Sequence, residues 1–263
     1  MDLFLKGRVA IVTGGASGIG RKICHAYAEE GAHSVIFDIN EENGKKVVKE
    51  CGDKGTEALL FHGDCSKEEA CQQAVKETLG KFGKVDILVH NAAPYTDGSA
   101  VMPFLEQTQE MWDDFVDTIF WGAIYTTKAV LPHMFERQYG RIVYISSDAG
   151  RTGDAFQAVY GGCKAGLAGF MKSMAQYGGR KNVLVNIASP ALTITDENED
   201  MLNLAYKYDT EEGRKRVTKV YPTGKLSTGQ DLANMVAFLT SDRSSNVTGQ
   251  IVGVDGGYFM PAP

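Results

Sequence analysis

The sequence predicts an α/β fold with a doubly wound parallel sheet of about seven strands and helices on both faces. Short runs rich in β-branched residues alternate along the chain with longer amphipathic stretches. Most of the short runs are almost continuously apolar, as strands covered on both faces are. A repeated order of strand, helix and strand implies right-handed crossovers between parallel strands, which leads to this architecture.

The expected strands, in chain order, are residues 9–13, 33–37, 57–63, 86–90, 141–146, 183–189 and 250–256. Helices are expected between them, among others at 18–31, 66–82, 109–137, 155–179 and 229–241. A chain of 263 residues with 43% hydrophobic residues can bury one sizeable core. We therefore expect a single domain over residues 1–263.

One polar segment, residues 192–228, breaks the alternation and is called the lid segment below. It follows a strand end, at the edge where open α/β sheets bind their ligands, and it is too long for a simple connection. We expect a mobile lid over a substrate pocket. A plain surface excursion is the alternative.

Composition excludes several classes of function. A net charge of -6 and a pI near 5.4 argue against a nucleic-acid or anionic-membrane partner, which favours a basic face. No apolar run approaches the roughly 20 residues that span a bilayer. A strand pattern begins at residue 9, which leaves no room for a signal peptide, so a cytoplasmic protein is expected.

The five cysteines lack CxxC spacing and the histidines form no HExxH pair, so we expect reduced thiols and no metal site.

The stretch TGGASGIG, residues 13–20, joins the first expected strand to the first helix. Gly14, Gly18 and Gly20 allow a tight turn and a close approach to a phosphate, while the start of the helix offers free N–H groups. Asp38 ends the next strand 18 residues after Gly20, where a carboxylate can accept hydrogen bonds from an adenosine ribose. This context predicts a dinucleotide site.

Asp38 also predicts which dinucleotide binds. Its carboxylate would repel a 2′-phosphate, and neither the glycine turn nor Ile39 supplies the Arg or Lys that NADP favours. We therefore expect NAD as the cofactor. A solvated turn residue is the alternative interpretation of Asp38.

Five motifs, in this order and spacing, resemble those of the short-chain dehydrogenase/reductase family: TGGASGIG, HNAA at 90–93, ISS at 145–147, YGGCK at 160–164 and TGQIVGVDGG at 248–257. The resemblance covers essentially the whole chain. It implies a Rossmann-like fold, hydride transfer to or from a nicotinamide, and assembly as a homotetramer.

Within YGGCK, Tyr160 and Lys164 lie one helical turn apart and share a face of the expected helix. A free tyrosine has a pKa near 10, and an adjacent ammonium favours the phenolate, which brings Tyr160 toward general acid/base chemistry. The two intervening glycines cost about 1 kcal/mol each in a helix, which is understandable if bulk there would block packing or cofactor approach. The resemblance assigns the hydrogen bond to the substrate oxygen to Ser147, with Ser146 as the competing candidate, so the expected catalytic residues are Ser147, Tyr160 and Lys164.

The resemblance further implies a set of cofactor contacts. Asp64 would meet the adenine ring, and the Thr195 hydroxyl would bond the nicotinamide carboxamide. Each of these residues alone is also a common turn or cap residue. The full set is Gly14, Ser17, Gly18, Ile19, Gly20, Asp38, Ile39, Asp64, Cys65, Asn91, Ala92, Ala93, Tyr160, Lys164, Pro190 and Thr195.

Three positions depart from the family's pattern. Ile119 stands where the family usually has an asparagine that holds a water in a proton relay, and an isoleucine side chain can neither donate nor accept. Ala191 follows Pro190 in place of the usual glycine, which narrows the space near the nicotinamide. Tyr177 replaces a glutamate on a helix that commonly packs against a partner subunit.

Substrate contacts are expected from residues next to the motifs. They are Pro94, Tyr95, Ala149, Phe156, Gln157, Leu192, Met201 and Leu204. Because most are apolar or aromatic, they predict a hydrophobic secondary alcohol or ketone. A basic cluster in the lid segment could meet an anionic tail such as a CoA phosphate, although a solvated helix face is the alternative. It consists of Arg214, Lys215, Arg216 and Lys219.

Together these observations predict an NAD(H)-dependent oxidoreductase that interconverts a hydrophobic secondary alcohol and its ketone, with Tyr160 as general acid/base. The alternative is a catalytically weak or inactive subunit of the same fold that binds dinucleotide and supports a partner. Ile119 motivates that alternative.

Overall fold

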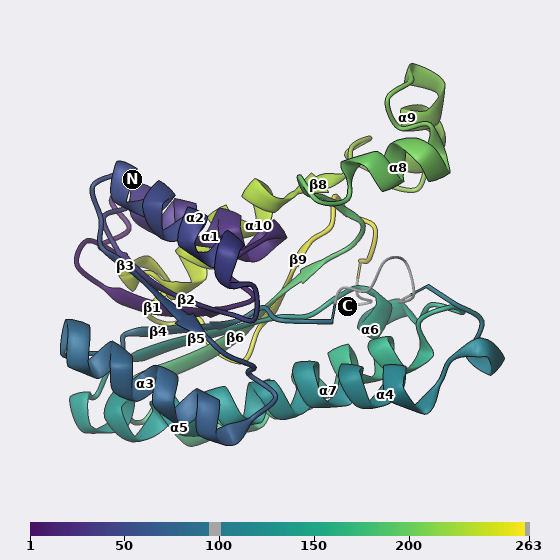
Figure 1. Ribbon diagram of the computed structural model, residues 1–263. Coiled ribbons are helices and arrows are strands. Elements are labelled where there is room, and N and C mark those ends of the chain that lie inside the picture. The colour runs from purple at the N-terminus through teal and green to yellow at the C-terminus, as the bar shows by residue number, and fades with distance from the viewer. Residues whose placement is uncertain (95–100, 261–263) are drawn as a thin grey trace.

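The structure is a computed structural model that describes residues 1–94 and 101–260. Its central sheet has seven parallel strands in the order β3-β2-β1-β4-β5-β6-β9 (Figure 1). The strands are β1 Val9–Thr13, β2 His33–Asp38, β3 Ala58–His62, β4 Ile87–His90, β5 Gly140–Ile145, β6 Val183–Pro190 and β9 Ile251–Val254. The strand order reverses between β1 and β4, which creates the switch point at which such sheets bind ligands. The doubly wound fold class is confirmed.

Helices cover both faces of this sheet (Figure 1). One face carries α1 Gly18–Glu29, α2 Glu41–Asp53 and α10 Gly229–Thr240; the other carries α3 Glu68–Phe82, α4 Gln109–Phe115, α5 Gly122–Arg137 and α7 Ala158–Gly179. Short helical turns occur at Phe104–Glu106, Asp242–Ser244 and in α6, Ala149–Thr152. Over the described ranges, none of the helices combines the length and apolar character needed to cross a membrane.

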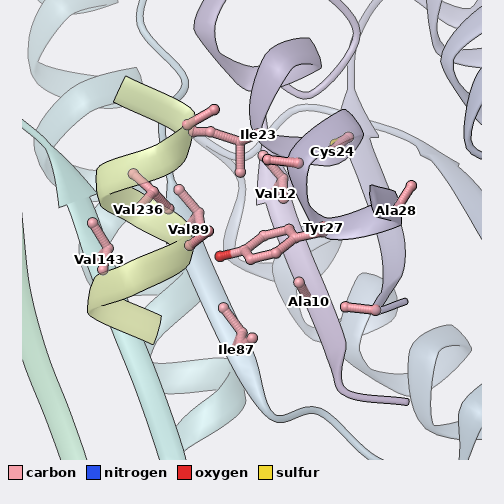
Figure 2. Packing of buried hydrophobic residues seen from close by; sticks show 14 of the residues in the cluster. Ala10, Val12, Ile23, Cys24, Tyr27, Ala28, Ile87, Val89, Val143 and Val236 are labelled. Carbon is pink, nitrogen blue, oxygen red and sulfur yellow. The ribbon is translucent and has the colours of Figure 1, made fainter. Parts of the chain in front are cut away.

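Tyr27 anchors the core between α1, α10 and the sheet (Figure 2). Its ring is fully buried beside Val12 and Val89 from neighbouring strands and Val236 from α10. The phenol oxygen lies 3.0 Å from the Thr240 hydroxyl, so its polar end is satisfied inside the core. This packing fixes α1, and with it the glycine turn that precedes α1.

The expected strands and helices all form, and their ends shift by no more than three residues. The helix α2 lies outside the residue ranges given for the expected helices. It is strongly polar and buries Gly44, Val47 and Cys51 along one stripe. Asn40 caps its start by accepting a hydrogen bond from the Asn43 amide at 3.0 Å.

The lid segment is ordered by its own short elements. Its ends form a two-stranded parallel ladder of β7 Thr193–Ile194 and β8 Ser227–Thr228, and between them lie α8 Glu199–Tyr206 and α9 Glu211–Thr218. Figure 1 shows α8 and α9 standing apart from the layered body. The loop between α8 and α9 is tied by Arg214, which donates to the carbonyls of Tyr208 and Asp209 at 3.1 and 2.8 Å.

The basic cluster of the lid segment is used mainly within that segment. Besides Arg214, Arg216 donates to the carbonyl of Tyr206 at 3.0 Å, at the end of α8. Lys215 pairs with Glu211 one turn earlier at 2.6 Å. The cluster is also exposed, which agrees with the alternative interpretation of it as a solvated helix face.

Candidate active site

The glycine turn between β1 and α1 forms an open cradle at the carboxyl end of the sheet. Gly14 and Gly18 have φ of +64° and +49°, which side-chain-bearing residues rarely adopt. A Cβ at Gly14 would lie 2.9 Å from the Asn91 amide nitrogen, and one at Gly20 would collide with the Gly14 carbonyl. The side-chain amide of Asn91 donates through Nδ2 to the backbone carbonyls of Thr13 and Gly14, both at 3.1 Å. The cradle is therefore shaped by close backbone approach and held by Asn91.

Asp38 adjoins this cradle at the end of β2. One carboxylate oxygen accepts from the Ala16 amide at 2.9 Å and the other from the Asn40 amide at 2.8 Å. Each oxygen keeps a further lone pair, so the carboxylate can still accept from hydroxyl groups of a ligand. Ile39 beside it is 71% exposed and offers no charge.

Asp64 and Cys65 lie just after β3, near the start of α3. Asp64 accepts from the amide and the hydroxyl of Ser66, both at 2.8 Å, so its carboxylate organises its own turn. Cys65 is buried, and its carbonyl accepts from the Cys71 thiol at 3.3 Å. These contacts match the turn interpretation of Asp64, while its place next to β3 stays compatible with an adenine contact.

Tyr160 and Lys164 face each other in the first turns of α7. The Lys164 ammonium lies 5.6 Å from the centroid of the Tyr160 ring. It is buried and donates to the carbonyl of Ile145 at the end of β5, at 2.7 Å. Burial lowers the pKa of Lys164 to about 8. Phe115 packs against the Tyr160 ring in an edge-on arrangement at a centroid distance of 5.8 Å, so this ring has both an aromatic neighbour and a nearby cation.

The two serines after β5 have different surroundings. Ser146 is buried, and its hydroxyl donates to the backbone carbonyl of Lys164 at 2.9 Å. Ser147 is half-buried, and its hydroxyl oxygen accepts from the Ala149 amide at 3.2 Å; within residues 1–94 and 101–260 its proton has no hydrogen-bond acceptor. Ser146 thus links β5 to α7, whereas Ser147 hydrogen-bonds only locally within the part of the chain that the structure describes.

The glycines between Tyr160 and Lys164 differ as well. A Cβ at Gly161 would lie 2.9 Å from the carbonyl of Ala149, because α6 packs directly on this turn of α7. A Cβ at Gly162 would meet nothing within 4 Å. Close packing therefore explains Gly161 and leaves Gly162 unexplained.

Ile119 lies in a π-helical turn, Val116–Trp121, that joins α4 to α5. Its side chain is fully buried in the core below α7. Its backbone carbonyl lies 3.2 Å from Nε2 of His90, the last residue of β4. A π-helical turn inserted in an α-helix is often found at functional sites. The polar group presented at this position is thus the backbone carbonyl, with His90 as its partner.

His90 is held as a neutral imidazole in one tautomer. The Thr13 hydroxyl oxygen accepts from the backbone N–H groups of Asn91 and Ala92 at 3.0 and 3.1 Å. Its single proton therefore points to Nδ1 of His90, which lies 3.2 Å away. Nδ1 is then the acceptor, and Nε2–H donates to the Ile119 carbonyl. Burial and the nearby Lys164 ammonium lower the pKa of His90 to about 3. Sequence reasoning did not single out this residue, although it directly precedes Asn91 at the end of a strand.

The lid segment meets the cradle near Gly18. The Thr195 methyl group would lie 3.8 Å from a Cβ at Gly18, so Thr195 faces the glycine turn across the site. Pro190 ends β6 and accepts from the Asp148 amide through its carbonyl at 2.8 Å. Glu197 accepts directly from the Gly18 amide at 2.9 Å, a contact that sequence reasoning missed.

The expected substrate contacts have varied environments. Pro94, Ala149, Gln157 and Leu192 are half-buried, and Phe156 and Met201 are 48% and 44% exposed. Leu204 is 89% exposed, whereas the neighbouring Leu202 is the residue of α8 that is buried. Tyr95 lies outside the described residues. Among the described members of this set, Leu204 is therefore the most exposed, and its side chain points away from the buried face of α8.

The chain is similar to known proteins over nearly its whole length. A family model described as Enoyl-(Acyl carrier protein) reductase matches residues 14–259. The chain is 34% identical over 259 residues to 3-oxoacyl-(acyl-carrier-protein) reductase FabG of Chlamydia muridarum, covering 98% of this chain and 99% of that protein. It is 33% identical over 257 residues to 2,3-dihydroxy-2,3-dihydro-p-cumate dehydrogenase of Pseudomonas putida, covering 97% and 96%. A crystal structure of levodione reductase is similar with a TM-score of 0.87 at 27% identity, covering 96% of this chain and 97% of that one.

Proposed function

The chain belongs to the short-chain dehydrogenase/reductase family of oxidoreductases, which use nicotinamide dinucleotides, and on that premise we propose that it is an NAD(H)-dependent enzyme interconverting a hydrophobic secondary alcohol and its ketone. The observation that carries this proposal is the buried Lys164 ammonium facing the Tyr160 ring at 5.6 Å. A fixed positive charge beside a phenol favours its anionic form and so supports proton transfer.

The residues of the site divide the chemistry among them. A bound nicotinamide supplies the acceptor or donor of hydride. Ser147 donates its free hydroxyl proton to the substrate oxygen, and Tyr160 takes the hydroxyl proton of an alcohol or returns it to a ketone. Lys164 keeps the positive charge next to Tyr160, and its remaining N–H groups can hold a ribose hydroxyl.

Substitution of Tyr160 tests the assignment. We expect Tyr160→Phe to lower kcat by about 10²- to 10⁴-fold, because the proton carrier is removed. The assay screens hydrophobic secondary alcohols with NAD and follows the absorbance of the reduced cofactor. Tyr177→Phe is the matched control, since Tyr177 is a 64% exposed tyrosine of the same helix. Full activity of Tyr160→Phe would refute the role.

The preference for NAD is supported by Asp38 and Ile39 at the edge of the cradle. The carboxylate of Asp38 lies next to the Ala16 amide of the glycine turn, where it would meet a 2′-phosphate with like charge. Calorimetry of wild type with NAD and NADP measures the preference, and Asp38→Asn should narrow it. Tighter binding of NADP by wild type would contradict the proposal.

The substrate class is supported by the apolar character of Phe156, Leu192 and Met201. The names of two related proteins, a dihydroxy-dihydro-p-cumate dehydrogenase and levodione reductase, are consistent with chemistry at an alcohol or ketone. A panel of alcohols with increasing apolar size tests this class. A preference for small polyols would overturn it.

A second candidate function is a catalytically weak or inactive subunit that binds dinucleotide and supports a partner. The buried Ile119 side chain favours it, since no polar side chain stands at that position. The alcohol screen separates the two: NAD binding without turnover on any alcohol or ketone would favour the supporting subunit.

The remaining parts of the proposal concern assembly and motion. We propose a homotetramer in the cytoplasm and one domain whose lid segment, 192–228, closes over the substrate. Light scattering that shows a monomer would count against the tetramer. Equal hydrogen exchange of the lid segment with and without ligand would count against closure.

A further inference from the structure

A carboxylate of the chain itself occupies the start of α1. Glu197 Oε1 accepts from the backbone amide of Gly18 at 2.9 Å. Gly18 is the first residue of α1, where free N–H groups and the positive end of the helix favour an anion. The same amide belongs to the glycine cradle that would receive the phosphates of a dinucleotide.

The neighbouring residue strengthens this attachment. Asp196 lies 3.1 Å from the Lys22 ammonium and 3.8 Å from the Arg21 guanidinium, both in the first turns of α1. Two consecutive carboxylates of the lid segment thus meet one amide and two cations of a single helix. A partially exposed ion pair stabilises little alone, but here it directs Glu197 toward the cradle.

No side chain within α1 or at its N-cap position makes the hydrogen bond that Glu197 makes. Ser17 stands at the N-cap position, yet its side chain makes no capping hydrogen bond, and the first turn contains no acidic residue. Of the groups at this helix start, the Glu197 carboxylate is the one that carries a negative charge onto the Gly18 amide.

We propose that Glu197 imitates a phosphate of the cofactor and competes with it for the Gly18 amide. This inference rests on the proposed dinucleotide site and adds a residue that sets its affinity. Binding of a pyrophosphate requires Glu197 to leave Gly18, because two anions cannot share one amide without strong repulsion. Release of Glu197 frees the lid segment at Thr195–Glu197, so cofactor binding and lid position are coupled.

Binding measurements with ADP and adenosine test the competition. ADP contains the adenosine and pyrophosphate parts of NAD, and adenosine contains no phosphate. Removal of the charge in Glu197→Gln should tighten ADP binding by about three- to tenfold and leave adenosine unchanged. Glu197→Ala should act in the same direction. Glu199→Gln is the matched control, since Glu199 lies two residues further along, exposed in the first turn of α8.

Each outcome of the calorimetry is informative. Equal ADP affinity of wild type, Glu197→Gln and Glu199→Gln overturns the competition while leaving the proposed function intact. An equal gain for adenosine and ADP also overturns it, because the effect then does not arise at the phosphates. If wild type binds neither ADP nor NAD, the proposed function itself is refuted. Thermal melting of each variant verifies that the compared proteins are folded.

Discussion

Replacement of Lys164 by methionine should change the pH dependence of stability. The ammonium is buried, and its pKa is lowered from 10.5 to about 8. At about 1.4 kcal/mol for each factor of ten, this difference means that keeping the ammonium charged in the folded protein costs about 3 kcal/mol below pH 8. Methionine is of similar length and removes that cost.

The sign follows from proton binding. Between pH 8 and 10.5 the unfolded chain binds more protons at this lysine than the folded protein does, so the wild type gains stability as pH rises. The variant lacks this gain and also leaves the Ile145 carbonyl without its 2.7 Å partner, at a cost of about 1–2 kcal/mol. We expect Lys164→Met to be more stable than wild type by about 1–2 kcal/mol at pH 7 and to lose that advantage by about pH 10.

Urea unfolding of both proteins at several pH values measures this difference, and titration of groups distant from Lys164 cancels in the comparison. Lys172→Met is the control, because Lys172 is an exposed lysine of the same helix. A stability difference that stays constant from pH 7 to pH 10 for Lys164→Met would refute the reasoning about the buried charge.

Two further pairs of substitutions separate structural from chemical roles in the same region. Gly161→Ala should destabilise the protein by about 1–2 kcal/mol, because its Cβ would lie 2.9 Å from the Ala149 carbonyl, whereas Gly162→Ala should stabilise it by about 0.5–1 kcal/mol; equal urea midpoints for the two variants would contradict the packing argument. Ser146→Ala should cost about 1 kcal/mol of stability with turnover retained, whereas Ser147→Ala should lower kcat by about 10²-fold with stability nearly unchanged. Unfolding and alcohol oxidation assays measure both, and the reverse pattern would exchange the two assignments.

The sheet was predictable from the sequence because its strands are buried on both faces. Runs such as 9–13 and 183–189 are mostly apolar and buried at every position, and burial of that kind leaves a signal in most residues. The polar helix α2 was harder to predict from apolar periodicity, since it buries only Gly44, Val47 and Cys51. Its cap residue Asn40 and the Glu41–Lys45 pair would have indicated it.

The candidate site was predictable where it depends on neighbours in sequence. Tyr160 and Lys164 share a helix face because they are four residues apart, and the structure brings them together as expected. His90 and Glu197 could not be assigned in this way. Their partners, Ile119 and Gly18, lie 29 and 179 residues away, and only the folded chain brings them into contact.

The neutral state of His90 has a consequence for interpreting kinetics. A change in reaction rate near pH 6 to 7 is ordinarily attributed to the titration of a histidine side chain. The pKa of this imidazole is about 3, and both of its ring nitrogens are hydrogen-bonded. It therefore has a structural role, because it links β4 to β1 and to the π-helical turn that contains Ile119. An inflection near neutrality in the rate of this enzyme therefore has to originate in another group, and reagents that acylate histidine should spare this one.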